Sequence, residues 1–429
     1  MDNQAYSVRS SKELKAVSEQ NGDMQVISQL SDKELISPAS RWTIRHLIAY
    51  RLLVCPEKAF LAVLQPEHEE CPICEEGLSQ AIDHINTRAL VEDAPRNLCP
   101  QLDHDLIRLP GGFFWIALAR AARNEHVDLV RVHPQRERIP VQREGYVSSA
   151  SAIPGSSPPL LYSSSFEADT SDVDEDEHDA RRDKPEEVTV HLVHCFLQNV
   201  LHLCLLQHST GKDTDTDMGT GTDIGTDIEV RPRIERKMTS THIAGALVSA
   251  EDDGGLCQMR RSPDGWKMLH PYLAMIEAKK AFKHYSEDKA GRYMPIISNQ
   301  NLAQYLGEAV ITWKENQKFL QRGVFLIAAT NTFVRFLHFR FGRDYSDYLD
   351  AIDKQAQMRI VNDEQRDPHA YMHSTRWLNL QSGEGRKNAL CHILALIRWH
   401  EDFTESNSQG SAYRSEDSGS DSDSMDTNE

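Results

Sequence analysis

Apolar residues recur at helical spacing in several segments of the chain, three or four positions apart, as one buried face of an α-helix requires. The segments predicted to be helical are 40–54, 112–126, 187–207, 299–318, 345–360 and 386–403. The segment 187–207 is apolar on most of its faces, so we expect it to be deeply packed.

Short apolar runs bounded by turn residues predict strands in the second half of the chain. These runs are 242–250, 256–261, 271–280, 324–330 and 332–341. Asp-Gly pairs at 253–254 and 264–265 permit tight turns between the first three runs. From residue 187 to residue 341 the order is helix, three strands, helix, two strands. This order predicts an α/β or α+β fold with a mixed central sheet flanked by helices.

Polar and low-complexity stretches divide the chain into predicted regions. We expect a disordered N-terminus, a mainly helical region, an acidic Ser/Pro-rich linker, a domain with an internal Thr/Asp/Gly loop, and an acidic disordered tail. Their respective bounds are 1–36, 37–146, 147–186, 187–403 with the loop 209–229, and 404–429.

The formal net charge of −18 is unevenly distributed. Residues 231–400 hold 25 Lys+Arg and 18 Asp+Glu, a net charge of +7, which leaves 22 and 47, or −25, for the rest. A basic region of this size is compatible with a phosphate-bearing partner, whereas the overall acidity comes from the stretches expected to be disordered.

The sequence has no run of 18 apolar residues and no apolar signal-peptide core at residues 1–20. We therefore expect a protein without a membrane partner that stays inside the cell, in the nucleus or cytoplasm, and is not secreted. Eight cysteines without a dense framework fit reduced thiols better than disulfides.

The run 272–276 is apolar without a break, and the strand it predicts ends in Glu277-Ala278-Lys279. Residues i and i+2 of a strand point to the same face, so Glu277 and Lys279 project side by side. A carboxylate beside an ammonium suits a metal-dependent phosphodiesterase. The other interpretation is a solvated strand end with an incidental ion pair.

A second carboxylate is available just before the strand 256–261. If this strand pairs with 271–280 as a hairpin, Asp253 comes to lie beside Glu277, because antiparallel pairing joins the start of one strand to the end of the other. Asp252 is the alternative. Mg2+ prefers oxygen ligands of this kind, with Mn2+ as a substitute.

The ordered set of an Asp-Gly turn, a Glu-x-Lys strand end and a helix bearing Gln resembles the PD-(D/E)XK phosphodiesterase superfamily. The resemblance extends over roughly residues 185–345 and is strongest to the lambda-exonuclease and recombination-nuclease branches. The sequence also resembles uncharacterised fungal proteins with such a domain. The resemblance to the superfamily implies a restriction-endonuclease-like core and hydrolysis of DNA. By the resemblance Asp253 and Glu277 bind Mg2+, Lys279 serves the attacking water, and Gln304 lines the site.

The chain departs from this family pattern in its first core helix. The family often places a Glu inside this helix, but residues 188–208 contain no acid, so only Glu187, or Glu186 beside it, can supply that ligand. An alternative is therefore a catalytically inactive nuclease-fold module that binds nucleic acid or protein.

The N-terminal half contains a Cys-x2-Cys pair, a spacing typical of zinc sites. Cys71 and Cys74 make the pair, and Cys99 with His104 would complete four Zn2+ ligands, with His84 as an alternative to His104. The competing interpretation is free thiols in a helical region.

Overall fold

A β-sheet assembled from distant parts of the chain is the centre of the structure, which is a computed structural model. The strands are β1 (Leu52–Val54), β2 (Ile228–Arg233), β3 (Lys237–Ile243), β4 (Ala246–Asp252), β5 (Gly255–Ser262), β6 (Gly265–Lys279), β7 (Tyr285–Glu287), β8 (Tyr293–Pro295), β9 (Val324–Thr330), β10 (Phe333–Phe341), β11 (Ala370–Ser374) and β12 (Leu378–Asn379). The central sheet has the order β1-β11-β10-β9-β6-β5-β2, and β12 pairs with β10. The pairs β1–β11 and β6–β9 are parallel and the other pairs are antiparallel.

Helices surround this sheet. They are α1 (Ser11–Gln20), α2 (Asp32–Leu35), α3 (Ile44–Ala49), α4 (Gln65–Glu69), α5 (His84–Val91), α6 (Asp103–Leu106), α7 (Gly112–Ala122), α8 (Glu186–Asn199), α9 (Asn299–Glu315), α10 (Tyr345–Asp350), α11 (Lys354–Asn362) and α12 (Gly383–Ala412). The fold is thus α/β with a mixed sheet and flanking helices.

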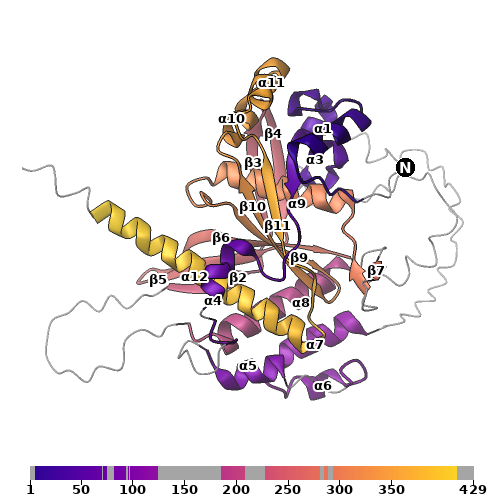
Figure 1. Ribbon diagram of the computed structural model, residues 1–429. Coiled ribbons are helices and arrows are strands. Elements are labelled where there is room, and N and C mark those ends of the chain that lie inside the picture. Colours follow the sequence, from indigo (N-terminus) through magenta and orange to yellow (C-terminus); the bar gives the residue numbers. More distant parts are fainter. Residues whose placement is uncertain are drawn as a thin grey trace, which may run out of the picture. The chain divides into compact units, whose positions relative to one another are not determined.

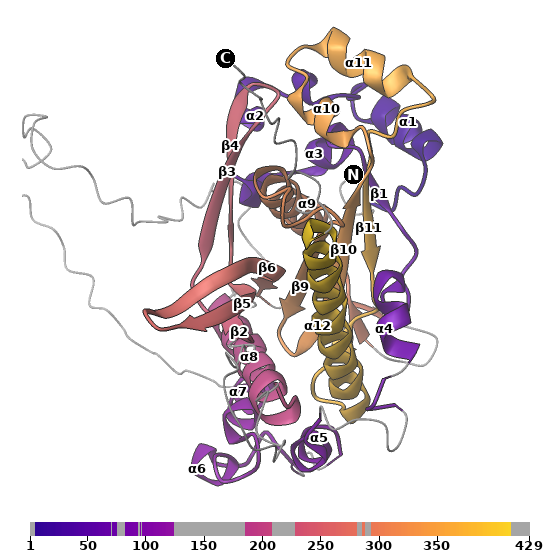
Figure 2. The ribbon, with the colours of Figure 1, turned by 90° about the vertical axis from the view of Figure 1, so that its left-hand side faces the viewer.

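Two hydrophobic cores separate along the alternating faces of β6. Ala274, Ile276 and Ala278 belong to a core that includes α7, α8 and α12. Met275 belongs to a second core, which includes the N-terminal segments, α9 and α10. Figures 1 and 2 show α7 and α8 on one side of the β5–β6 pair and β3 and β4 on the other. Glu277 and Lys279 follow Met275 in the alternation and therefore face the α9 side.

Local sequence signals explain several element boundaries. The Ser298 side chain accepts a hydrogen bond from Asn301 N and begins α9. Residues 242–250, expected as one strand, instead form the end of β3, a turn and β4. Ala244 and Gly245 both have positive φ at this turn, a backbone conformation that favours glycine and gives a tight hairpin.

The N-terminus differs from the expectation of disorder over residues 1–36. Helices α1 and α2 lie in this range, and Val26 and Ile27 are fully buried. The segment is polar on average, but its few apolar side chains contact a core built by distant residues. The average composition of a segment cannot predict such tertiary contacts.

The structure describes residues 5–69, 71–74, 82–92, 95, 97–123, 185–207, 228–280, 285–287 and 293–412. The described residues up to 123 and those from 185 onward belong to one compact unit. The predicted linker 147–186 lies outside the described residues except at its end, where Glu186 begins α8. The predicted loop 209–229 also lies outside them, except for its last two residues, which belong to β2.

The predicted disordered tail 404–429 overlaps α12, which continues to Ala412, and its remainder lies outside the described residues. No helix in the described ranges is both long and apolar enough to span a bilayer.

Candidate functional site

Glu277 and Lys279 lie together at the C-terminal end of β6. The Lys279 ammonium donates to Glu277 Oε1. The Glu277 side chain is only 2% exposed, whereas that of Lys279 is 16% exposed. The pair is therefore partly enclosed by protein and not a frayed strand end, and solvent reaches it from the lysine side.

The hairpin expected between the two strands is present and brings Asp253 beside this pair. Gly255 of β5 pairs with Met275 of β6. The pairing continues where Asp253 N donates to Ile276 O at 3.0 Å. The Asp253 carboxylate then accepts the Ala278 N–H through Oδ2, also at 3.0 Å. Ala278 lies between Glu277 and Lys279, so one backbone hydrogen bond fixes the aspartate beside both.

A helix acid joins the group, and it is Glu186, not Glu187. Lys279 Nζ lies 4.0 Å from Glu186 Oε2, and Arg236 Nη2 lies 3.1 Å from Asp253 Oδ1 and 4.0 Å from Glu186 Oε1. Glu187 is exposed, because neighbouring helical positions point about 100° apart. The choice of Glu187 as a ligand is therefore not supported by the geometry.

Helix α9 adds an amide and a second buried carboxyl from its inner face. Gln304 Nε2 donates to Glu277 Oε1 at 2.5 Å and to Glu308 Oε1 at 2.8 Å. Gln304 and Glu308 are one helical turn apart, so both face the end of β6. The Glu308 side chain is fully buried, which the polar helix pattern does not reveal.

The charges of the site are held in a poorly solvated environment. Burial raises the pKa of Glu277, although the Lys279 ammonium offsets part of this effect. Burial and the nearby Glu277 raise the pKa of Glu308 well above its usual value. Burial also disfavours charge on Lys279, but the Glu277 carboxylate outweighs it and raises the pKa of Lys279. Crowded carboxyls of this kind retain protons unless a cation takes their place.

Asp252, the alternative to Asp253, has a different environment. Its Oδ2 lies 2.6 Å from Arg233 Nη2, and both side chains are 3% exposed. Its Oδ1 accepts hydrogen bonds from the backbone N–H groups of Gly254 and Lys237, both at 3.1 Å. These contacts make Asp252 a structural residue at the end of β4.

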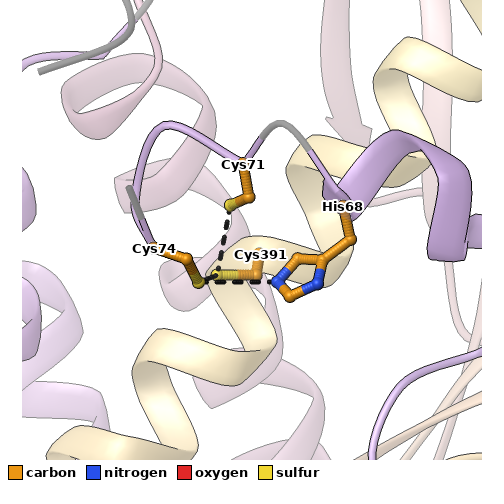
Figure 3. Close-up of side chains that lie close together, drawn as sticks. All are labelled: His68, Cys71, Cys74 and Cys391. Atoms are coloured by element: carbon orange, nitrogen blue, oxygen red, sulfur yellow. Dashed lines mark hydrogen bonds between the residues drawn. The ribbon is translucent and has the colours of Figure 1, made fainter. Parts of the chain in front are cut away.

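A separate cluster of four metal-ligating side chains lies between α4 and α12. It consists of His68, Cys71, Cys74 and Cys391, whose ligand atoms all lie within 4.8 Å of one another (Figure 3). Cys71 and Cys391 are buried, and Cys74 is exposed. This His/Cys3 cluster could hold a metal ion.

The cluster corrects the ligand set expected from the sequence. Cys71 and Cys74 belong to it, but Cys99 and His104 do not. Cys99 is exposed and contributes its carbonyl to Arg123, and exposed His104 lies 3.3 Å from Asp105. The His68-x2-Cys71 spacing was a local signal for one missed ligand, whereas Cys391 follows Cys74 by 317 residues and gave none.

Neither a protein-family model nor a curated protein matches this sequence. The two groups of side chains also differ in chemistry. Carboxylate oxygens at the end of β6 suit hard cations such as Mg2+, whereas thiolates and an imidazole suit softer ions. Among the described residues, the two groups therefore differ in the kind of metal ion that their donor atoms suit.

Proposed function

We propose that the chain is a divalent-metal-dependent nuclease that hydrolyses phosphodiester bonds of DNA, with a restriction-endonuclease-like core. The observation that carries the proposal is that Asp253, Glu277, Glu186 and Lys279 lie together at the end of β6, with Asp253 bound to the Ala278 backbone. Four segments of the chain supply the site, since Gln304 joins it from α9.

The donors fit a hard divalent ion such as Mg2+ or Mn2+. Asp253 and Glu277 present carboxylate oxygens about the Ala278 backbone, and Glu186 lies at the exposed side. A bound ion would neutralise charge on the phosphate and lower the pKa of an attacking water. The carboxyls whose pKa burial raises would exchange their protons for that ion.

The remaining residues have distinct roles in this proposal. Lys279 stays protonated, because Glu277 raises its pKa, so it acts as a hydrogen-bond donor to water or to a phosphate oxygen and not as a base. Gln304 orients Glu277. Arg236 is 48% exposed beside Asp253, and a guanidinium there suits a phosphate of the DNA backbone. The net charge of +7 over residues 231–400 favours the same partner.

Cleavage of labelled single- and double-stranded DNA tests the proposal. We expect cleavage with Mg2+ or Mn2+ and none when the divalent ion is omitted. Omission is preferable to a chelator, which would also strip the thiolate cluster. Lys279→Ala lowers the rate by roughly 10²- to 10³-fold, the usual cost of losing one charge-stabilising donor. Lys280→Ala is the matched control, because Lys280 is exposed and follows the last residue of β6.

Equal cleavage by the wild type and Lys279→Ala would contradict the proposed site. DNA binding without cleavage under any divalent ion would favour the inactive nuclease-fold module. The ion pairs Lys279–Glu277 and Arg236–Asp253 favour that alternative to a degree, because cations of the protein itself already neutralise the two central carboxylates.

A further inference from the structure

We infer that His68, Cys71, Cys74 and Cys391 bind one Zn2+ ion, which fastens α4 and the segment after it to the N-terminal third of α12. The site uses residues distinct from the carboxylate site. Its role is therefore independent of any nuclease activity.

Three of the six distances between the ligand atoms match the edges of a zinc tetrahedron, and all six are within 4.8 Å. With Zn–S near 2.3 Å and Zn–N near 2.0–2.1 Å, tetrahedral angles give about 3.8 Å between sulfurs and about 3.6 Å between sulfur and nitrogen. Cys391 Sγ lies 3.7 Å from Cys71 Sγ and 3.8 Å from Cys74 Sγ. Cys74 Sγ lies 3.5 Å from His68 Nε2.

The backbone of the short segment presents three of the ligands together. Cys71 N donates to His68 O at 3.1 Å, and Cys74 N donates to Cys71 O at 3.0 Å. These successive turns place side chains three residues apart on the same side, toward α12 (Figure 3). The His68 ring stacks on Phe60 with centroids 4.1 Å apart, and Phe60 stacks on His392, the residue after Cys391. Aromatic packing thus orients the imidazole toward the thiols.

The four ligand types favour Zn2+ over harder cations and favour a structural site over a catalytic one. Three thiolates and one imidazole are soft ligands that suit Zn2+ and disfavour Mg2+ or Ca2+. Four protein ligands close a tetrahedral site, which leaves no open position for a substrate. The sulfurs are also too far apart for a disulfide, whose S–S bond is about 2.05 Å, and all three cysteines are free.

The ion would add to the attachment that this segment has to α12. Phe60 already stacks on His392, and Arg398 Nη1 lies 3.4 Å from Glu67 O. Farther along α12, His400 Nε2 lies 3.1 Å from Leu273 O on β6. Zn2+ would therefore join the N-terminal half of the chain to a helix that also contacts the central sheet.

Elemental analysis of the purified full chain tests the assignment. We expect about one zinc per chain in the wild type and in Cys99→Ser, and little in Cys74→Ser or Cys391→Ser. Replacement by Co2+ should give the strong thiolate-to-cobalt absorption and intense visible bands of a tetrahedral site. Both features should be lost in Cys74→Ser.

Stability provides a second readout. Zinc removal should lower the melting temperature of the wild type by roughly 5 °C or more, because the ion binds the folded chain only. Treatment with the chelator that removes the zinc should leave the melting temperature of Cys74→Ser unchanged. The Cys74 side chain is exposed, so this variant decides the question if Cys391→Ser does not fold.

Three results would overturn the assignment. They are a wild-type chain that binds no zinc after refolding with Zn2+, loss of zinc in Cys99→Ser, and iron with sulfide in place of zinc. Lys279→Ala should retain its zinc whatever its effect on DNA cleavage.

Discussion

Asp252 and Asp253 are adjacent in the chain, but their carboxylates have different surroundings. Asp252 is paired with Arg233 where both side chains are almost fully buried. Asp253 accepts the Ala278 N–H and contacts the half-exposed Arg236. The Asp252–Arg233 pair stabilises the fold. Asp253 instead presents a carboxylate oxygen beside Glu277 and Lys279 at the end of β6.

Neutralising each aspartate should separate these roles. Asp252→Asn leaves Arg233 as an unpaired buried charge and should lower the free energy of unfolding by about 3 kcal/mol. Asp253→Asn keeps an acceptor for Ala278 and should cost less than about 1 kcal/mol, while DNA cleavage is lost. Urea unfolding and the cleavage assay measure the two effects. A larger stability loss in Asp253→Asn would reverse the assignment.

The buried carboxyls Glu277 and Glu308 make the stability of the protein depend on pH. Both have a raised pKa in the folded state, so the folded chain binds protons more tightly than the unfolded chain does. Their contribution is complete below the unfolded pKa, near about 4.3, and is lost as the pH rises toward the folded values. Without divalent metal, the stability that these two carboxyls contribute should therefore fall above pH 5, whereas buried histidines with a lowered pKa, such as His338 and His392, contribute in the opposite direction below about pH 6.5.

Glu308→Gln should flatten this dependence. The change removes one titrating group and keeps an oxygen that can accept from Gln304. Each such carboxyl contributes a slope of up to about 1.4 kcal/mol per pH unit. Urea unfolding between pH 5 and 8, without divalent ions, measures the slope. Glu315→Gln, at an exposed position of the same helix, should leave the slope as in the wild type, and an equal slope in Glu308→Gln would be inconsistent with a buried, proton-binding Glu308.

Site residues that are close together in the sequence could be predicted, whereas residues brought in from distant parts of the chain could not. Glu277 and Lys279 share a strand face, and Asp253 follows from the hairpin, so local rules were sufficient for these residues. The sequence offered both Glu186 and Glu187 for the helix acid, and the choice of Glu186, like the place of Arg236, depends on tertiary contacts that no local pattern encodes. The ligand Cys391 was missed for the same reason.

At the scale of elements, the N-terminal segment depends on contacts with the far end of the chain. Ile27 is fully buried, and its backbone N–H donates to the hydroxyl of Tyr348 at 3.3 Å. The next residue, Ser28, donates its N–H to Gln357 Oε1 at 2.9 Å. The segment is therefore part of the core that contains α10.

Ile27→Ala should lower the free energy of unfolding by about 2–5 kcal/mol, the usual cost of deleting a buried isoleucine side chain. Ile36→Ala provides the control, because Ile36 is 62% exposed, and should change stability by less than about 0.5 kcal/mol. Urea unfolding of the two variants compares them directly. Equal effects would mean that residues 24–30 do not pack as described.

Other elements show where sequence patterns succeed and where they fail. The strands β9 and β10 and the helix α9 lie where apolar periodicity predicts them. The expected helix 40–54 instead ends at Ala49, and Arg51 has a positive φ of 57° before β1. Pairing with β11 overrides the helical pattern of the Leu-Leu-Val run.

At the scale of the whole molecule, the class of fold follows from the order of elements, but the order of strands does not. An alternation of helices and strands predicts a mixed sheet covered by helices. The edge position of β1 and its parallel pairing with β11 depend on contacts between residues more than 300 positions apart. Periodicity carries no information about such pairs.

The pairing of β1 with β11 has a consequence for how the protein is made. Leu52 pairs with Ala370, which is synthesised 318 residues later. At 5–20 residues per second, roughly 15 to 60 s pass before the partner strand emerges. During this interval the N-terminal segment leaves the ribosome with its apolar side chains uncovered. Chaperone binding to the nascent chain should therefore be strongest before residue 370 is translated.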